Sequence, residues 1–184
     1  MNRRRIVIDA DILRSAGLAR SDSETAVACR SFLECVKESR HYVTLSPEIL
    51  AEWRRHTSVY AATWLVEMRS RRRIHFVEPE GDGGCRVQLE ELVADEYQMH
   101  RMDKDMHLVE AALISDRLIA SRDESVRSDF RMFACDIRAL STLTWVNPCV
   151  PEDEAMDWLK AGAPSERHRF LCPRRVRRRR RRRR

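Results

Sequence analysis

The sequence predicts an α/β protein in which a central parallel sheet of about five strands lies between two layers of helices. Short apolar segments alternate with longer segments whose apolar residues recur at helical spacing, and no internal repeat interrupts the alternation. Strands that alternate with helices favour a parallel sheet covered on both faces, which is a three-layer α/β/α sandwich. The 184 residues suffice for one such domain with a short extension.

The first half of the chain is expected to supply three strands and three helices. Ser21 and Glu24 have the spacing of a capping box and predict a helix that runs to about Arg40. Ser46-Pro47 starts a second helix, because proline suits the first helical turn, and a third helix covers about residues 59–70. The strands expected here are residues 5–8, 42–45 and 73–77.

The second half begins after a glycine-rich segment, residues 80–84, which lacks the lysine of a phosphate-binding loop and is interpreted as a connector. Two further strands are expected, at residues 118–121 and 143–146. The helices expected here are residues 87–99, 105–116, 124–133 and 152–161. Residues 1–150 are therefore assigned to the α/β domain, 151–173 to a C-terminal helix and extension, and 174–184 to a disordered arginine tail.

The sequence shows neither a membrane span nor a signal peptide. No apolar run approaches the roughly 18 residues of a membrane span, and Asp9 and Asp11 interrupt the apolar start too early for a signal peptide. A cytoplasmic protein without membrane association is expected. None of the six cysteines forms a Cys-x-x-Cys motif or pairs with histidines at zinc spacing, which predicts reduced thiols, most of them buried.

Acidic side chains stand where a parallel sheet would gather them. Asp9 and Asp123 each come directly after an expected strand, and ligands of such sheets collect at the carboxyl ends of the strands. Glu52 and Asp105 belong to expected helices. Mg²⁺ and Mn²⁺ are hard cations that prefer oxygen ligands. Together these four acids would hold such an ion, which lowers the pKa of its water and stabilises charge on a phosphodiester.

Each acid has a plainer interpretation when taken alone. Asp9 is typical of a turn at the end of a strand, and Glu52 of a solvated helix face. Asp105 and Asp123 suit the cap positions of the helices that follow them. Only the joint arrangement favours a metal site.

The four positions, taken in order, resemble the PIN domain, the nuclease fold of bacterial toxin ribonucleases of the VapC type. An apolar strand ends in Asp9, a Ser-Pro-x-x-x-x-Glu stretch ends in Glu52, Asp105 begins an alanine-rich helix, and a strand ends in Ser-x-Asp at Asp123. The interval of 18 residues between the last two acids is similar to that of the family. The resemblance covers about residues 5–146. Asp11 departs from it, since the family often has Asn or Ser there, and is either an extra ligand or a helix cap.

The resemblance implies a metal-dependent endoribonuclease. Asp9, Asp105 and Asp123 would bind Mg²⁺ or Mn²⁺, with Glu52 in direct contact or one layer further out; the family spacing favours Glu52 over Glu48, one turn earlier. RNA is the implied substrate. The role is that of a toxin, with an antitoxin protein and a second copy of the chain as candidate partners, or of a processing or defence nuclease.

Two other classes of function compete with this one. A non-catalytic module with a PIN-like scaffold would bind RNA or protein through its arginine tail, but it would have no need of all four acids. A nucleotide-binding protein of the Rossmann type is disfavoured, since no glycine fingerprint follows the first strand. Arg71–Arg73 are compatible with contact to an RNA backbone and equally with a solvated helix face.

The arginine tail generates the first testable prediction. Residues 174–184 contain ten arginines, so the net charge of +6 becomes −4 without them. Such a polycation would bind nucleic acid through counterion release, without reading sequence; the alternative is a low-complexity tail without a role. Deleting the tail is expected to flatten the dependence of RNA affinity on salt concentration, measured by fluorescence anisotropy. An unchanged salt slope would exclude a role in RNA binding.

Overall fold

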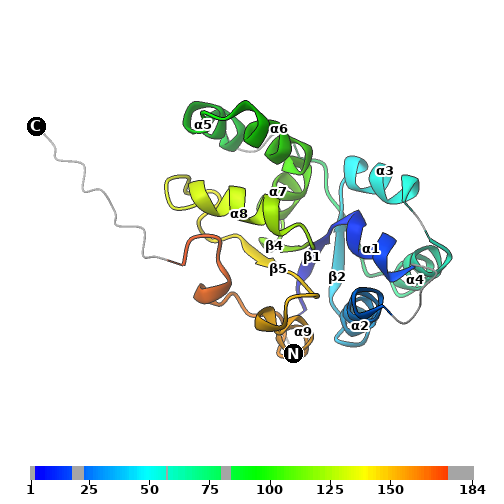
Figure 1. Ribbon diagram of the computed structural model, residues 1–184. Helices are drawn as coiled ribbons and strands as arrows, with labels where there is room; N and C mark the ends of the chain where they lie inside the picture. The colour runs from blue at the N-terminus through cyan, green and yellow to red at the C-terminus, as the bar shows by residue number, and fades with distance from the viewer. Residues whose placement is uncertain (1–2, 18–22, 57, 80–83, 174–184) are drawn as a thin grey trace, which may run out of the picture.

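The computed structural model describes residues 3–17, 23–56, 58–79 and 84–173. Five parallel strands in the order β3-β2-β1-β4-β5 form one sheet between helices, which confirms the predicted fold class (Figure 1). All four strand pairings are parallel. The strands are β1 (Arg5–Ile8), β2 (Tyr42–Leu45), β3 (Ile74–Phe76), β4 (Leu118–Ala120) and β5 (Thr144–Val146).

Helices cover both faces of the sheet. In Figure 1, α1, α2 and α4 lie on one side of it and α5 to α8 on the other, as expected when every crossover between parallel strands is right-handed. The helices are α1 (Ala10–Ala16), α2 (Glu24–Glu38), α3 (Pro47–Arg55), α4 (Val59–Ser70), α5 (Cys85–Leu92), α6 (Glu96–Lys104), α7 (Met106–Leu113), α8 (Glu124–Phe133) and α9 (Ala155–Lys160). Short 3₁₀ turns cover Pro151–Asp153 and Arg167–Arg169.

Side-chain caps explain where several helices begin. Ser46 Oγ accepts a hydrogen bond from Ile49 N (3.3 Å), with proline in the first turn of α3, as predicted. The cap of α2 is Ser23, two residues after the predicted Ser21: Ser23 Oγ accepts from Ala26 N (3.2 Å). Ser21 itself lies outside the described residues. The helix also ends at Glu38, before Arg40.

Three other helices differ from the sequence prediction. Residues 87–99 are not one helix: α5 ends at Leu92, and Asp95 caps a new helix by accepting from Tyr97 N (2.8 Å). The expected last helix is a 3₁₀ turn followed by the shorter α9. Helix α1 was missed altogether, because it begins directly after the first strand and has only seven residues. It packs closely on α4: a Cβ added to Gly17 would lie 2.0 Å from Ser58 Cβ.

The sheet forms the centre of the hydrophobic core. The three apolar residues of β1 are fully buried, as are all three of β4. The four tryptophans are at most 3% exposed. Trp53 Nε1 donates to Ile8 O (3.0 Å) and so ties α3 to β1, while Trp64 Nε1 donates to Leu33 O (2.8 Å) and ties α4 to α2 within one layer.

The segment after residue 150 packs on the α/β domain. Leu171 N donates to Leu143 O (2.8 Å), and Phe170 forms an antiparallel bridge with Thr144 at the edge strand β5. Buried His41 accepts from the backbone of Arg4 at Nδ1 (3.0 Å) and donates from Nε2 to Leu159 O (2.9 Å) at the end of α9. Burial lowers the pKa of His41, which keeps the ring neutral in this role.

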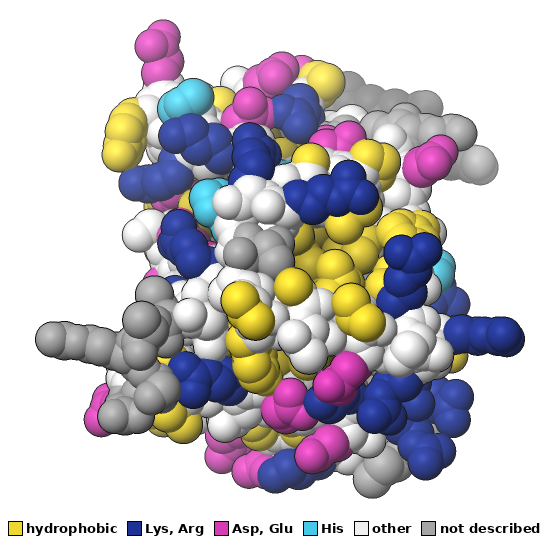
Figure 2. Space-filling model, turned by 90° about the vertical axis from the view of Figure 1, so that its right-hand side faces the viewer, with side chains coloured by type: hydrophobic (Ala, Val, Ile, Leu, Met, Phe, Trp, Pro, Cys, Tyr) yellow, Lys and Arg dark blue, Asp and Glu magenta, His cyan; other side chains and the backbone are white. Residues whose placement is uncertain are grey.

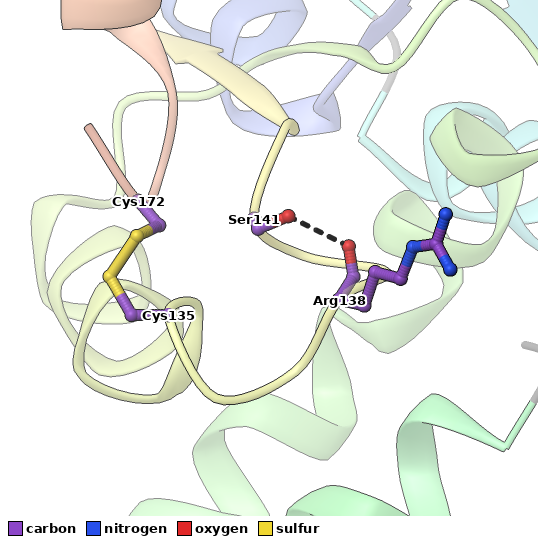
Figure 3. Close-up of a disulfide and its surroundings, with 4 residues drawn as sticks. All are labelled: Cys135, Arg138, Ser141 and Cys172. Carbon is purple, nitrogen blue, oxygen red and sulfur yellow. Dashed lines mark hydrogen bonds between the residues drawn. A yellow bond between two sulfur atoms is a disulfide. The ribbon is translucent and has the colours of Figure 1, made fainter. Parts of the chain in front are cut away.

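A disulfide joins this segment to the end of α8. Cys135 and Cys172 are linked, with their Cα atoms 5.1 Å apart (Figure 3). The prediction that all six cysteines are reduced is therefore wrong for these two, because chain folding brings together residues whose spacing in sequence carries no motif. The free thiols are Cys29, Cys35, Cys85 and Cys149. Between the two half-cystines, Ser141 Oγ donates to Arg138 O (2.8 Å) and tightens the loop before β5 (Figure 3).

The face that carries α2 to α4 has a hollow lined by apolar side chains, with lysine and arginine side chains around it (Figure 2). On the outer side of α4, Val59 is 87% and Val66 67% exposed. These two residues are seven apart, so they share one side of the helix. None of the described helices is both long and apolar enough to cross a membrane.

Removing the disulfide is expected to destabilise the fold. The bridge closes a loop with a sequence separation of 37, and a crosslink of this span reduces the entropy of the unfolded chain. Replacing both Cys135 and Cys172 by serine should lower the free energy of unfolding by about 2–4 kcal/mol, measured by urea denaturation. Wild-type protein treated with reductant should match the double variant. Equal stability of the oxidised wild type and the variant would contradict the expectation.

Candidate active site

Asp9 lies at the junction of the two central strands. Its backbone N–H donates to Ala120 O (2.9 Å) and so extends the pairing of β1 with β4. Ser121 Oγ donates to Asp9 Oδ2 (2.7 Å), and Asp11 N donates to Asp9 Oδ1 (3.2 Å), which makes Asp9 the N-cap of α1. The residue is only 7% exposed. Burial raises the pKa of Asp9, and Glu52 adds to the effect, although the bonds from Ser121 and Asp11 oppose it.

Asp123 follows the neighbouring strand β4. Its Oδ1 accepts from Val126 N (2.9 Å), so Asp123 is the N-cap of α8. Its own backbone N–H donates to Ser121 Oγ (3.1 Å). Ser121 therefore connects the two aspartates, by donating to the carboxylate of Asp9 and accepting from the backbone of Asp123. Unlike Asp9, Asp123 is exposed.

Asp105 lies between α6 and α7. It occupies the N-cap position of α7, yet its side chain makes no cap hydrogen bond. Helix α7 packs against β1, β2 and β4, which brings this junction to the same edge of the sheet as the two strand-end aspartates. Burial raises the pKa of Asp105 to about 7, and the charges of Asp9 and Asp123 contribute to that rise.

Glu52 reaches the cluster from α3 and is paired with a histidine. Glu52 Oε2 lies 3.0 Å from Nε2 of His107, whose Nδ1 lies 2.9 Å from Lys104 O. Both ring nitrogens face acceptors, which is the arrangement of a protonated imidazolium. Burial alone lowers the pKa of His107, but the bond and charge of Glu52 raise it overall; the same bond lowers the pKa of Glu52. Glu48, one turn earlier, is exposed.

Asp11 belongs to the first turn of α1 and is not its cap. Its Oδ2 accepts from Arg122 N (3.2 Å), between β4 and α8. Its Oδ1 is buried and has no hydrogen-bond partner within the described residues. Burial and the charge of Asp9 raise the pKa of Asp11 to about 8, against the charge of Arg122. Of the two interpretations from the sequence, the helix-cap role belongs to Asp9.

The predicted acids thus form one electrostatic cluster. The charge of Asp105 is coupled to those of Asp9, Asp123 and Glu52. As the side chains stand, however, no group of three or more His, Cys, Asp or Glu residues in the described ranges is arranged so that it could hold a metal ion. The donors suit Mg²⁺ or Mn²⁺ by chemistry, since all are carboxylate oxygens, they repel one another, and Asp11 presents a buried oxygen without a partner.

Sequence reasoning identified the acids but not the groups that hold them. The Ser121–Asp9 bond, the Asp11–Arg122 contact and the His107–Glu52 pair depend on the placement of elements that are distant in the chain. A signal was present only for Ser121, which precedes Asp123 by two residues at a strand end. The bond from Ser121 goes to the carboxylate of Asp9, not to that of Asp123.

Comparison with known proteins gives no relative for this arrangement. No family model, no curated protein and no solved structure matches the chain.

Replacing Asp105 by asparagine tests whether the ionised carboxylate of Asp105 destabilises the fold. A carboxyl group whose pKa is about 7 in the folded state, against 3.8 ordinarily, stabilises the fold at low pH and loses that contribution as pH rises from about 4 to about 7. In EDTA at about pH 8, Asp105→Asn should therefore be more stable than wild type, by an amount on the order of 1 kcal/mol.

Near pH 4 the difference between the two proteins should nearly vanish, because the wild-type carboxyl group is then protonated. Urea denaturation at the two pH values measures both quantities. A variant that is less stable than wild type at about pH 8 would show that Asp105 is held by favourable interactions instead of being repelled.

Proposed function

We propose that the protein is a metal-dependent endoribonuclease whose active site is the carboxylate cluster of Asp9, Glu52, Asp105 and Asp123. The observation that carries the proposal is the placement of the acids at the carboxyl edge of the sheet: Ser121 links Asp9 and Asp123, and α7 brings Asp105 to the same edge with no cap hydrogen bond from its side chain. Strongly perturbed titratable groups that gather at the carboxyl edge of a parallel sheet are typical of functional sites. RNA as the substrate rests on the resemblance to the PIN family.

The divalent ion, when bound, would supply a Lewis acid that stabilises charge on the scissile phosphate and activates a water. Asp9, Asp105 and Asp123 would hold it, with Glu52 beside them, and Asp11 is the nearest additional oxygen donor. Mg²⁺ and Mn²⁺ are equally compatible with these donors.

The residues of the chain itself keep this site ordered. Ser121 Oγ fixes the orientation of the Asp9 carboxylate, and the backbone of α8 fixes that of Asp123. The imidazolium of His107 keeps Glu52 ionised and holds a proton at Nε2, 3.0 Å from the carboxylate. Because loss of this proton would leave the Glu52 carboxylate unpaired, the pair serves to orient Glu52 and to keep it ionised.

The resemblance is compatible with two biological roles. A toxin of a toxin–antitoxin pair, with an antitoxin protein or a second copy of the chain as partner, is one form of the proposal, and a processing or defence nuclease in the cytoplasm is another. The arginine tail, outside the described residues, would add affinity for RNA without selecting a sequence.

A non-catalytic module that binds RNA or protein is the second candidate, and two observations favour it. Asp9 and Asp123 both serve as N-caps, which a purely structural role would explain. The side chains of the cluster also do not converge on one point as they stand. Activity measurements separate the two candidates.

The decisive experiment is cleavage of a labelled single-stranded RNA by the full chain in Mg²⁺ or Mn²⁺. Asp9→Asn and Asp105→Asn should each lower the cleavage rate by about a hundredfold or more, because charge that stabilises the transition state is lost. The two losses should not add in the double variant, since the ligands act as a unit. Asp11→Asn should have the milder effect.

Asp157→Asn is the matched control, because the side chain of this aspartate is 82% exposed and, among the described residues, its one ion pair is with Lys160 on the surface of α9. It should cleave at the wild-type rate, while EDTA should abolish cleavage. Full activity in EDTA, or in Asp9→Asn, would overturn the metal mechanism. No cleavage by wild type with either ion, together with intact RNA binding, would favour the non-catalytic module.

A further inference from the structure

The amino ends of β1, β2 and β3 border a pocket at the edge of the sheet opposite the acids. The cavity has a volume of about 550 Å³ and is lined by the arginines at positions 3–5, by Tyr42 and His75, and by Asp116. Arg5 and Tyr42 are the first residues of β1 and β2 and are paired in the sheet. Ile74, the first residue of β3, completes the wall.

Positive charge is in excess around this pocket. Asp116 is the carboxylate among the described lining residues, and it already has partners: its Oδ2 accepts from Arg5 N (2.8 Å) and lies 3.4 Å from Arg4 Nε. Within the described ranges, no salt bridge joins the guanidinium groups of Arg3, Arg5 or Arg73 to a carboxylate. Figure 2 shows lysine and arginine side chains gathered toward the lower right, at the end of the molecule where the N-terminus lies in Figure 1.

Two buried nitrogen atoms in this region lack partners. His75 Nδ1 and Arg73 Nη1 make no hydrogen bond within the described residues. Arg73 directly precedes β3, and its backbone O accepts from Val43 N (2.9 Å) at the start of β2. Burial lowers the pKa of Arg73, and the charges of Arg3 and Arg40 lower it further, so these cations lie near one another. Unsatisfied buried polar groups are few in native proteins and often mark a ligand.

We propose that this pocket binds a phosphate group that carries at least two negative charges, with Arg3, Arg5 and His75 of its lining as the hydrogen-bonding residues. Guanidinium groups match phosphate oxygens with paired N–H donors, and several converging cations favour a multivalent phosphate over a single carboxylate. The volume falls within the range of small-ligand sites, about 300–1,000 Å³. The ring of half-buried Tyr42 and the side chain of Ile74 offer an apolar wall to the rest of the ligand.

Binding of inorganic pyrophosphate to the full chain, measured by isothermal titration calorimetry in EDTA, tests the site. Arg5→Gln and Arg3→Gln should each weaken binding by about tenfold or more, because a charge-assisted hydrogen bond is lost. Arg131→Gln, a change at an exposed arginine of α8, should leave affinity within about twofold of wild type. This control sets the background from the arginine tail, which is unchanged in every variant. Circular dichroism verifies that each variant is folded.

Pyrophosphate binding that is equal in all variants, or absent in wild type, would overturn the proposal. The proposal does not rest on the nuclease function: Asp9→Asn should retain pyrophosphate binding whether or not it loses cleavage.

The phosphate could belong to a free nucleotide or to an RNA strand, and a second pair of probes distinguishes these sources. ADP and a short 5′-phosphorylated RNA are titrated into wild type and Arg5→Gln. Dependence of ADP affinity alone on Arg5 would assign the site to a free nucleotide, and dependence of RNA affinity would assign it to a strand. Independence of both from Arg5 would again overturn the proposal.

Discussion

The contact between Ser121 and Asp9 is the constraint on which the candidate site depends. It lies where β1 and β4 run side by side, and it couples the end of one central strand to the turn after the other. At this point the connections of the sheet diverge, since β1 leads to β2 on one side while β4 leads to β5 on the other. Each strand passes directly into a helix, α1 or α8, whose cap is an aspartate. The positive ends of both helices therefore face the carboxylates and offset part of their repulsion.

That compensation is incomplete, and charge divides between the two edges of the sheet. At the carboxyl edge, Arg122 offsets Asp11 and His107 offsets Glu52, while burial and the neighbouring acids keep the pKa of Asp105 raised. At the amino edge, arginines accumulate with one engaged carboxylate among them. Strands of three or four residues at about 3.3 Å per residue separate the two edges by only about 10–13 Å. The sheet therefore separates a cluster of acids from a cluster of arginines over a short distance.

The sequence was sufficient for the fold because the strands are short apolar runs whose limits coincide with charged or polar residues. Arg5 and Asp9 delimit β1, and Ser121 follows β4, so those strand limits were predicted to within one residue. Helix α1 was missed because a helix of seven residues shows too little periodicity of apolar residues. The break at Asp95 was missed because this capping aspartate lies among other polar residues and does not stand out from them. The disulfide was beyond reach for a different reason: its cysteines meet only because the last segment returns to β5.

The sequence could predict the placement of the strand-end acids, whereas their role as a metal site stays a prediction. Asp9 and Asp123 follow strand ends, and a parallel sheet places such residues at one edge whatever the rest of the chain does. Glu52 and Asp105 needed the family spacing, because their positions depend on how α3 and α7 pack against each other. Glu52 and His107 pair across this contact between α3 and α7, so the local sequence of neither helix predicts the pair. The basic pocket is similar, since it is assembled from the beginnings of three strands.

Whether the acids are structural caps or a reactive cluster depends most on Asp105. A cap uses only part of the accepting capacity of a carboxylate, so the cap bonds of Asp9 and Asp123 do not prevent a further ligand and instead hold both groups in fixed orientations. Asp105 occupies a cap position without using it, and its carboxyl group is held among other acids with a pKa of about 7. Such a placement destabilises the fold when the group is ionised. A purely structural role of Asp105 would not offset this loss of folding stability. A cation bound beside the ionised carboxylate would instead make its contribution to stability favourable.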